Sequence, residues 1–349
     1  MSGERAVAAR IALAGGILTV ALGVALRGLA GQIPLAYQYL PLVVSAIVLG
    51  VPHGAVDHLV LPRARDAPVT RRSLASVGGL YLLFGGGYAA VWVLAPAVAF
   101  VLFIVVTLLH WGQGDVYALV ELTGASHLPT RAARASTAIV RGGLPMLIPF
   151  VAFPEQYRFV AATVIGSFDP VAVGALDAVF APGVRLGVAF GFGLLTAATL
   201  GVGFYRAVDT GAVRPWLIDA GETLSLVAYF GLVPPILAIG LYFPLWHSLR
   251  HVLRTMLVDD VAAAALSDQS TGAAFLRFTR DAAPLTVVAV LIFGAVWVAV
   301  PVTPTTVPDA VGVYLVFIAV LTLPHVVVVL LLDRQLALWS PQRLSRSET

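Results

Sequence analysis

The chain has 349 residues, of which 59% are hydrophobic and only 11% are charged, whereas roughly 25% of the residues in a soluble domain are charged. This composition excludes an ordinary soluble protein, and the length is enough for about ten membrane crossings of ~20 apolar residues each. The sequence contains no cysteine, which excludes disulfides, thiolate-ligated haem and iron–sulfur clusters.

The formal net charge of +3 includes 21 basic residues, all of which are arginine. A retinal-binding opsin holds its chromophore on a lysine amine, so the lack of lysine excludes an opsin. The arginines lie between apolar segments and form no basic face with interleaved aromatic residues. We therefore expect no binding to nucleic acid.

Ten apolar segments, separated by proline, glycine and charged residues, are expected to form membrane-spanning helices. They comprise approximately residues 9–29, 38–60, 75–94, 97–114, 136–153, 183–205, 219–233, 236–256, 283–302 and 309–332. The predicted fold is an all-α, polytopic integral membrane helix bundle. It forms a single transmembrane domain over residues 1–349.

Three segments outside these spans are more polar. Residues 155–180 are expected to connect two spans and could include an interfacial helix. Residues 257–282 are the longest polar loop, and residues 333–349 are expected to form a short cytoplasmic tail.

The arginines predict the orientation. With ten spans and a cytoplasmic N-terminus, eighteen of the 21 arginines fall in cytoplasmic loops or at cytoplasmic helix ends. Only Arg27, Arg158 and Arg185 fall outside. Because loops on the cytoplasmic side carry an excess of basic residues, this distribution predicts a multi-pass protein of the cell (plasma) membrane with both termini in the cytoplasm.

Six of the seven histidines lie within or at the end of the apolar segments. They are His53, His58, His110, His247, His251 and His325. The seventh, His127, follows Ser126 in a polar loop and is expected to be solvated. Ionisable or metal-binding groups at membrane depth are costly and usually mark a functional site. The predicted orientation places all six toward the cytoplasmic ends of four helices. Neutral imidazoles without cysteine suit iron, copper or zinc.

Spacing ranks these histidines as metal ligands. His247 and His251 are four residues apart, so their side chains lie about 40° apart on one helix face. His53 and His58 are about 140° apart and cannot both reach one metal from a regular helix. His53 is the better ligand, because it lies deeper and the flanking Pro52 and Gly54 could break the helix.

The neighbours of these histidines leave alternatives open. Asp57 lies on the same helix face as His53 and could orient that ring, or it could pair with Arg63 or Arg65 at the membrane surface. His110 lies level with the other histidines and is expected to be a ligand. His325 could be a fifth ligand, a neighbour of a ligand, or a polar contact to the substrate.

Four imidazoles without a carboxylate ligand would leave Fe(2+) with open positions for dioxygen and substrate, whereas zinc would bring no oxygen chemistry. Aromatic residues crowd the same region, where helix packing accounts for most of them and some could line a tunnel for a long polyene. The residues expected around the metal or the substrate are Asp57, Asp115, His325, Trp111, Tyr242 and Trp246.

Four motifs resemble those of the membrane-bound beta-carotene dioxygenases of bacteria and archaea, also called bacteriorhodopsin-related or Brp/Blh proteins. The motifs are GVPHGAVDH, LLHWGQGD, WHSLRH and LPHVVVVLLLD, and they occur in the order typical of that family. No single motif is specific, but the combination is. It extends over most of the chain.

The resemblance implies an enzyme that cleaves the central double bond of beta-carotene with dioxygen and releases two retinals. It implies an Fe(2+) cofactor held by four histidines, which correspond to His53, His110, His247 and His251. The implied partners are beta-carotene, dioxygen and the lipid bilayer. An opsin that accepts the retinal would be a further partner.

Two other classes of protein compete with this interpretation. Membrane di-iron hydroxylases, desaturases and carotene ketolases resemble one another in having histidine boxes with eight or more histidines, and this chain has six at depth. The second class is a non-enzymatic carrier, either a bis-histidine haem protein or a metal transporter. A haem absorption band would identify the former, and the latter would be expected to carry acidic residues in mid-membrane.

Overall fold

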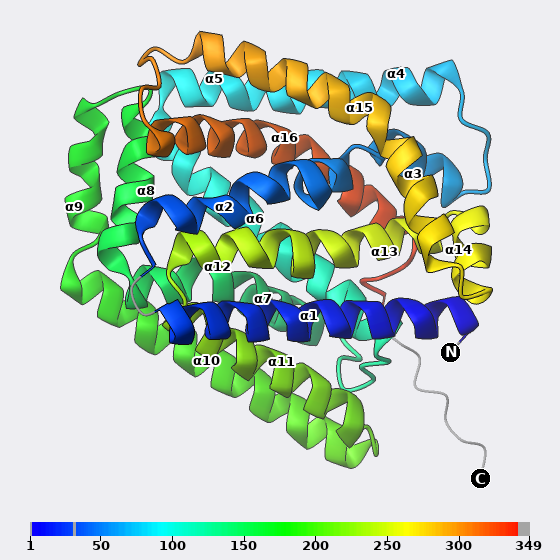
Figure 1. Cartoon of the computed structure of the whole chain (residues 1–349). Coiled ribbons are helices and arrows are strands. Elements are labelled where there is room, and N and C mark those ends of the chain that lie inside the picture. The colour runs from blue at the N-terminus through cyan, green and yellow to red at the C-terminus, as the bar shows by residue number, and fades with distance from the viewer. Residues whose placement is uncertain (1, 31–32, 341–349) are drawn as a thin grey trace.

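The computed structural model describes residues 2–30 and 33–340, and this part of the chain is helical without a β-strand (Figure 1). The first half contains α1 (Gly3–Ala30), α2 (Leu35–Ser45), η1 (Ala46–Gly50), η2 (Pro52–Gly54), α3 (Asp57–Arg63), α4 (Arg71–Leu80), η3 (Tyr81–Gly85), α5 (Gly86–Leu94), α6 (Pro96–Tyr117), η4 (Ala118–Leu122), α7 (Arg131–Ala152) and α8 (Pro154–Gly166). The second half contains η5 (Val171–Ala175), α9 (Leu176–Val179), α10 (Pro182–Asp209), α11 (Val213–Leu232), α12 (Pro235–Tyr242), η6 (Phe243–Ser248), α13 (Leu249–Leu257), α14 (Asp260–Ser267), α15 (Thr271–Ala299) and α16 (Val307–Gln335).

Eight helical stretches in the described part of the chain are long and apolar enough to cross a membrane. They are Gly3–Leu29, Leu35–Arg63, Arg71–Leu94, Pro96–Leu122, Arg131–Ala152, Pro182–Asp209, Thr271–Ala299 and Val307–Gln335. The prediction of an all-α polytopic membrane bundle is confirmed. The expected number of spans was about ten, so two predicted spans fall outside this set.

Those two spans, residues 219–233 and 236–256, are helical but more polar. They correspond to α11 and to the continuous α12–η6–α13 rod, which run between the same two ends of the bundle as their neighbours (Figure 1). Acidic residues lower the hydropathy of α11, and basic residues lower that of α13. One such pair, Glu222 and Arg250, is joined across the two helices at 2.6 Å.

The polar segments are more regular than the sequence suggested. Residues 155–180 form α8, η5 and α9. Residues 257–282, expected as a polar loop, form α14 and the first turns of α15, because Asp259 caps α14 by accepting hydrogen bonds from its first amides. Of the expected tail, residues 333–335 still belong to α16, and residues 341–349 lie outside the described residues.

Asp259 also links α14 to two other elements. Its carboxylate accepts a hydrogen bond from Arg277 at 2.7 Å and pairs with Arg63 at 3.0 Å. Burial alone would raise the pKa of the Asp259 carboxyl, but the hydrogen bond from Arg277 and the charge of Arg63 outweigh burial and lower that pKa below its usual value. The carboxylate therefore stays ionised at neutral pH.

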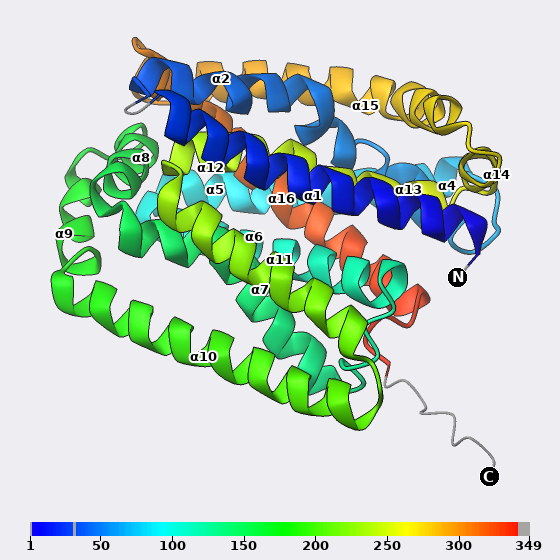
Figure 2. The same ribbon diagram turned by 60° about the horizontal axis from the view of Figure 1, so that its bottom comes forward.

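The bundle has buried and exposed helices. Helix α7 and helix α16 are largely enclosed by other helices, whereas α10 and α15 are mostly exposed. In Figure 1 and Figure 2, α10 lies along one edge and α15 along another, with α6, α12–α13 and α16 between them. The exposed faces carry large apolar side chains such as Leu186, Phe190 and Leu291. Such faces suit contact with lipid.

Candidate metal centre and adjoining cavity

His53 lies where a helix is interrupted. Helix α2 ends at Ser45, a π-helical turn covers Ala46–Gly50, and a 3₁₀ turn covers Pro52–Gly54 before α3 begins. Pro52 lacks an amide hydrogen and cannot continue the α-helical hydrogen bonding. The break aims the His53 ring into the bundle, where its Nδ1 bonds the carbonyl oxygen of Gly50. The expected break next to this histidine is present.

A second irregular turn carries His247. The six residues Phe243–Ser248 form a π-helical turn that includes Pro244, and His251 follows on α13. Turns of this kind inside helices are frequent at functional sites because they redirect side chains. His110 lies on α6, and His325 follows Pro324 within α16. Four separate helical rods therefore supply the histidines.

Five histidine rings meet at one place in the bundle interior. The ring centres of His53 and His325 are 5.0 Å apart, those of His110 and His247 are 4.7 Å apart, and those of His251 and His325 are 4.9 Å apart. All five side chains are buried. His325 is as close to the other rings as any of the four expected ligands.

The donor set fits a transition metal. The Nε2 atoms of His110 and His247 face each other at 3.1 Å, and two nitrogens bound to one metal at about 2.0–2.1 Å lie roughly 3 Å apart. One nitrogen each of His53, His110 and His325 lies within 4.8 Å of the other two. The Nε2 atoms of His251 and His325 are buried without a hydrogen-bond partner in the described structure. An unpaired buried polar atom is costly, and these two nitrogens could hold a metal ion.

The remaining two histidines lie outside the ring cluster. Within the described residues, His58 makes no ring contact with the five clustered histidines. His127, expected to be solvated, is fully buried and bonds Asp219 at 3.1 Å. That expectation was wrong, because the loop between η4 and α7 folds back against α11.

Asp57 orients His325 rather than His53. Its Oδ2 atom lies 2.8 Å from Nδ1 of His325 and accepts a hydrogen bond from the Tyr81 hydroxyl at 2.6 Å. A proton on Nδ1 of His325 leaves Nε2 free to bind a metal, which is the usual role of a carboxylate behind a ligating histidine. Asp57 does not pair with Arg63, which instead contacts Asp259 and Asp281.

Asp115 acts on the backbone that carries the His247 and His251 pair. Its carboxylate accepts hydrogen bonds from the Trp246 indole at 2.9 Å and from Arg250 at 2.9 Å. Arg250 also stacks over the Trp246 ring and pairs with Glu222. Asp115, which the sequence predicted near the metal or the substrate, therefore contacts Trp246 and Arg250, the residues that directly precede His247 and His251.

The three expected aromatic residues divide into two groups. Trp111 packs against the His247 ring at 5.3 Å and lines a large cavity. Tyr242 and Trp246 stack on each other at 5.8 Å and do not line that cavity. Trp111 is therefore placed to touch a substrate, whereas the other two hold η6 in position.

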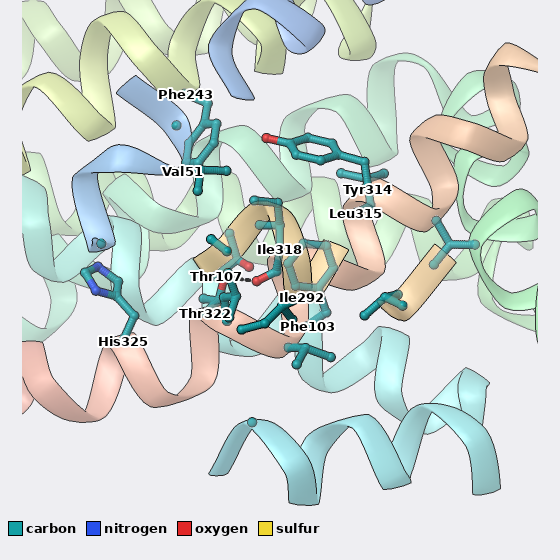
Figure 3. A pocket seen from close by; sticks show the side chains of 18 of the residues that line it. Val51, Phe103, Thr107, Phe243, Ile292, Tyr314, Leu315, Ile318, Thr322 and His325 are labelled. Carbon is teal, nitrogen blue, oxygen red and sulfur yellow. Dashed lines mark hydrogen bonds between the residues drawn. The ribbon is translucent and has the colours of Figure 1, made fainter. Parts of the chain in front are cut away.

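The cavity has a volume of about 1010 Å³ and is lined almost entirely by apolar side chains, which places it at the upper end of the usual range for ligand sites. Figure 3 shows part of its wall, with His325 at one side and Tyr314 toward the other. On α16 the lining runs from Pro308 to His325, which at 1.5 Å per residue is about 26 Å.

The clustered histidines lie along the cavity and not at its end. His53, His110, His247 and His325 are part of its wall. Tyr81 is level with His325 because both bind Asp57, and the lining continues on α4 to Leu74. A long apolar molecule could therefore extend past the histidines in both directions.

The comparisons with known proteins agree with this arrangement. A family model described as "Beta-carotene 15,15'-dioxygenase" matches residues 44–333. The probable beta-carotene 15,15'-dioxygenase Blh of Halobacterium salinarum is 48% identical over 297 residues, which is 85% of each chain. The probable beta-carotene 15,15'-dioxygenase Brp of the same species is 34% identical over 322 residues, 88% of this chain and 87% of that protein.

The chain belongs to the beta-carotene 15,15'-dioxygenase family. No solved structure matches it. The match to this dioxygenase family begins before His53 and ends at Asp333, so it includes all five clustered histidines.

Several residues near the centre of this dioxygenase were not identified from the sequence. Tyr81 binds Asp57 from another helix, and Ser248 lies 3.4 Å from Nδ1 of His53. Phe243 packs edge-on against His53 at 5.5 Å. Ser248 follows His247 directly and Phe243 lies four residues before it, so their position in the sequence could have indicated that they lie near the centre. No local pattern links Tyr81 to Asp57.

Proposed function

We propose that this protein cleaves the central double bond of beta-carotene with dioxygen and releases two retinals. Its membership of the beta-carotene 15,15'-dioxygenase family supports this reaction. The observation that carries the proposal is the cluster of buried histidine rings in the wall of a long apolar cavity. Such a cavity suits a hydrocarbon that must be held beside a metal.

We assign the metal as Fe(2+), held by His53, His110, His247 and His251, with His325 as a fifth ligand through Nε2. The set contains only imidazoles, which suit iron, and five of them would leave one of six coordination positions open for dioxygen. When bound, iron would supply the redox chemistry that lets dioxygen react with a double bond. One iron per chain by metal analysis, without haem absorbance, is the expected result.

The chain's own residues position the substrate and exclude water. Trp111 and Phe243 lie in the cavity wall next to His247. Because the cavity extends past the histidines on both sides, the middle of a polyene can lie near the metal while its rings lie away from it. Orientation of this kind accelerates a reaction by removing the entropy cost of alignment.

The substrate is proposed to come from the lipid. Leu82 and Val288 line the cavity and are also exposed on the outer surface of the helices, Leu82 to 79%. Leu82 belongs to the α4–η3–α5 rod and Val288 to α15, and these two rods form one wall of the cavity. A hydrophobic molecule could therefore pass from the membrane into the cavity without crossing water.

The test is product analysis with purified protein, Fe(2+) and beta-carotene. Retinal as the one product in air, with no cleavage under nitrogen, is expected. A mixture of apocarotenals of different lengths would exclude a fixed position of the double bond. Hydroxylated but uncleaved carotenoid would assign the protein to the hydroxylases. Transfer of retinal to an opsin in the same membrane remains a prediction from the sequence.

A further inference from the structure

Tyr81 lies in a π-helical turn that carries no histidine. The π-helical turn η1 leads to His53 and the π-helical turn η6 carries His247, whereas η3 interrupts the rod formed by α4 and α5. Turns of this kind inside helices are frequent at functional sites. Tyr81 is the one polar residue of η3, and its side chain lines the cavity. A contribution of η3 to the site therefore points to Tyr81.

The Tyr81 hydroxyl contacts the carboxylate behind a clustered histidine. It donates a hydrogen bond of 2.6 Å to Oδ2 of Asp57, and the same oxygen lies 2.8 Å from Nδ1 of His325. Asp57 is only 1% exposed, and its other oxygen, Oδ1, is buried without a partner in the described structure. Among the described residues, Tyr81 and His325 therefore fix the rotation of this carboxylate. Hydrogen bonds to a charged group are the stronger ones, so loss of either would free the carboxylate to rotate.

The rod that carries Tyr81 packs against the helix that carries His325. A β-carbon added at Gly85 would lie 3.4 Å from the carbonyl oxygen of Val320 and 3.8 Å from Cγ of Pro324. Pro324 directly precedes His325, so the α4–η3–α5 rod lies beside α16 at the level of that histidine (Figure 1). The hydroxyl of Tyr81 is therefore supplied from a backbone whose position is set next to the histidine itself.

We propose that Tyr81 is a positioning residue for the metal, because its hydroxyl holds Asp57 in the rotation that binds Nδ1 of His325. The proposal rests on the proposed function, which makes His325 a metal ligand through Nε2. A carboxylate behind a ligating histidine fixes the tautomer and the orientation of the ring, and Tyr81 adds one further link. The Tyr81 ring has a separate role as part of the cavity wall. The hydroxyl and the ring can be tested independently.

Tyr81→Phe removes the hydroxyl and keeps the ring. The matched control is Tyr88→Phe on the same rod, because the Tyr88 hydroxyl also donates a hydrogen bond, of 2.7 Å to the Ala99 carbonyl, but Tyr88 does not line the cavity. Metal-free protein is titrated with Co(2+), which suits the same donors and whose absorption bands report its coordination geometry. We expect Tyr81→Phe to weaken Co(2+) binding about tenfold, the lower end of the range for loss of a group behind a ligand, and to change the bands. Tyr88→Phe should match the unmodified protein.

Two further measurements show whether the hydroxyl acts through Asp57. In protein that already carries Asp57→Asn, Tyr81→Phe should change the Co(2+) affinity by about twofold or less, because the carboxylate that it positions is absent. A tenfold loss in that background would overturn the proposal. Metal-free Tyr81→Phe should bind beta-carotene as tightly as the unmodified protein, because the ring is retained. Loss of carotenoid binding together with metal binding would show a general change of the cavity wall and would overturn it too.

Unchanged Co(2+) affinity and unchanged bands in Tyr81→Phe would likewise overturn the proposal. If the unmodified protein bound no Co(2+), both this proposal and the assignment of the metal would fail. Binding of Co(2+) with the expected effect of Tyr81→Phe, but no retinal from beta-carotene with Fe(2+) and dioxygen, would support the role of Tyr81 and count against the proposed reaction alone.

Discussion

The carboxylate of Asp57 connects Tyr81 and His325, which are more than two hundred residues apart in the sequence. Its position sets which nitrogen of His325 carries the proton. The sequence placed Asp57 on the face of His53 because four-residue spacing puts two side chains on one face of a regular helix, although a break at Pro52 and Gly54 was also expected. The 3₁₀ turn at Pro52–Gly54 rotates Asp57 away from that ring and toward α16. A change in helix type was not visible in the residue spacing.

Asp57→Asn tests the orientation of His325. The amide can replace the carboxylate in shape but cannot fix the tautomer or raise the basicity of the ring. We expect iron affinity to fall 10–100-fold, as is typical when a carboxylate behind a ligating histidine is lost. Titration of metal-free protein with Fe(2+) under nitrogen measures this. Unchanged affinity would show that His325 is not a ligand.

The two histidines of the first motif are expected to differ sharply. His53→Ala should lose bound iron, because His53 lies within the five-ring cluster, whereas His58→Ala should keep it, because His58 lies outside that cluster. Metal analysis of the two variants, together with thermal unfolding in detergent, separates ligand loss from misfolding. Equal iron loss in both variants would contradict the assignment.

At the scale of elements, buried charges attach the start of α13, which directly follows the π-helical turn η6, to neighbouring helices. Asp115 on α6 and Glu222 on α11 both bind Arg250, which lies next to His251. The sequence predicted helices in these regions because they are apolar runs bounded by proline, glycine and charged residues. It did not predict that Asp115, Glu222 and Arg250 would meet, because ion pairs between helices depend on how the rods are packed.

Arg250→Met tests the structural role of this network. Removal of Arg250 leaves the buried carboxylates of Asp115 and Glu222 to share the charge of Arg141, and loss of one partner of a buried ion pair typically destabilises a protein by about 3–5 kcal/mol. We expect a large drop in the midpoint of thermal unfolding in detergent and weaker iron retention. Arg158→Met is the control, because its pair with Asp177 is exposed and such pairs contribute only about 0–1 kcal/mol. Equal effects of the two substitutions would contradict the proposed role.

Adjacent glycines on α5 provide a matched test of the cavity. Gly86 lines the cavity and Gly87 does not, and a β-carbon added at either position would meet no surrounding atom within 4 Å. Gly86→Leu should therefore fill the path of the polyene and strongly reduce cleavage, whereas Gly87→Leu should have little effect. Initial rates at several beta-carotene concentrations and the iron content of both variants check this. Equal activity of the two would exclude this cavity as the substrate site.

At the scale of the whole molecule, the two ends of the bundle differ in charge. The start of α1 and the end of α16 lie at the same end, close to α3 and α14 (Figure 1). Arg5, Arg63 and Arg277 belong to that end, and Arg5 pairs with Glu121 there at 3.2 Å. Arg158 and Arg185 belong to α8 and α10 at the opposite end. The bias that the sequence predicted is therefore present in the fold, although the orientation in a membrane depends on loop charge and not on packing.

The orientation itself is the last prediction. Because basic residues remain on the cytoplasmic side, we expect the arginine-rich end, with both termini, to face the cytoplasm. A reporter that is active only in the cytoplasm should work when fused at either terminus, and one that is active only outside should work in the loop between α15 and α16. Reversed reporter activity would show that charge does not set the topology. Activity of opposite reporters at the two termini would require an odd number of crossings, which would contradict the placement of the start of α1 and the end of α16 at one end of the bundle.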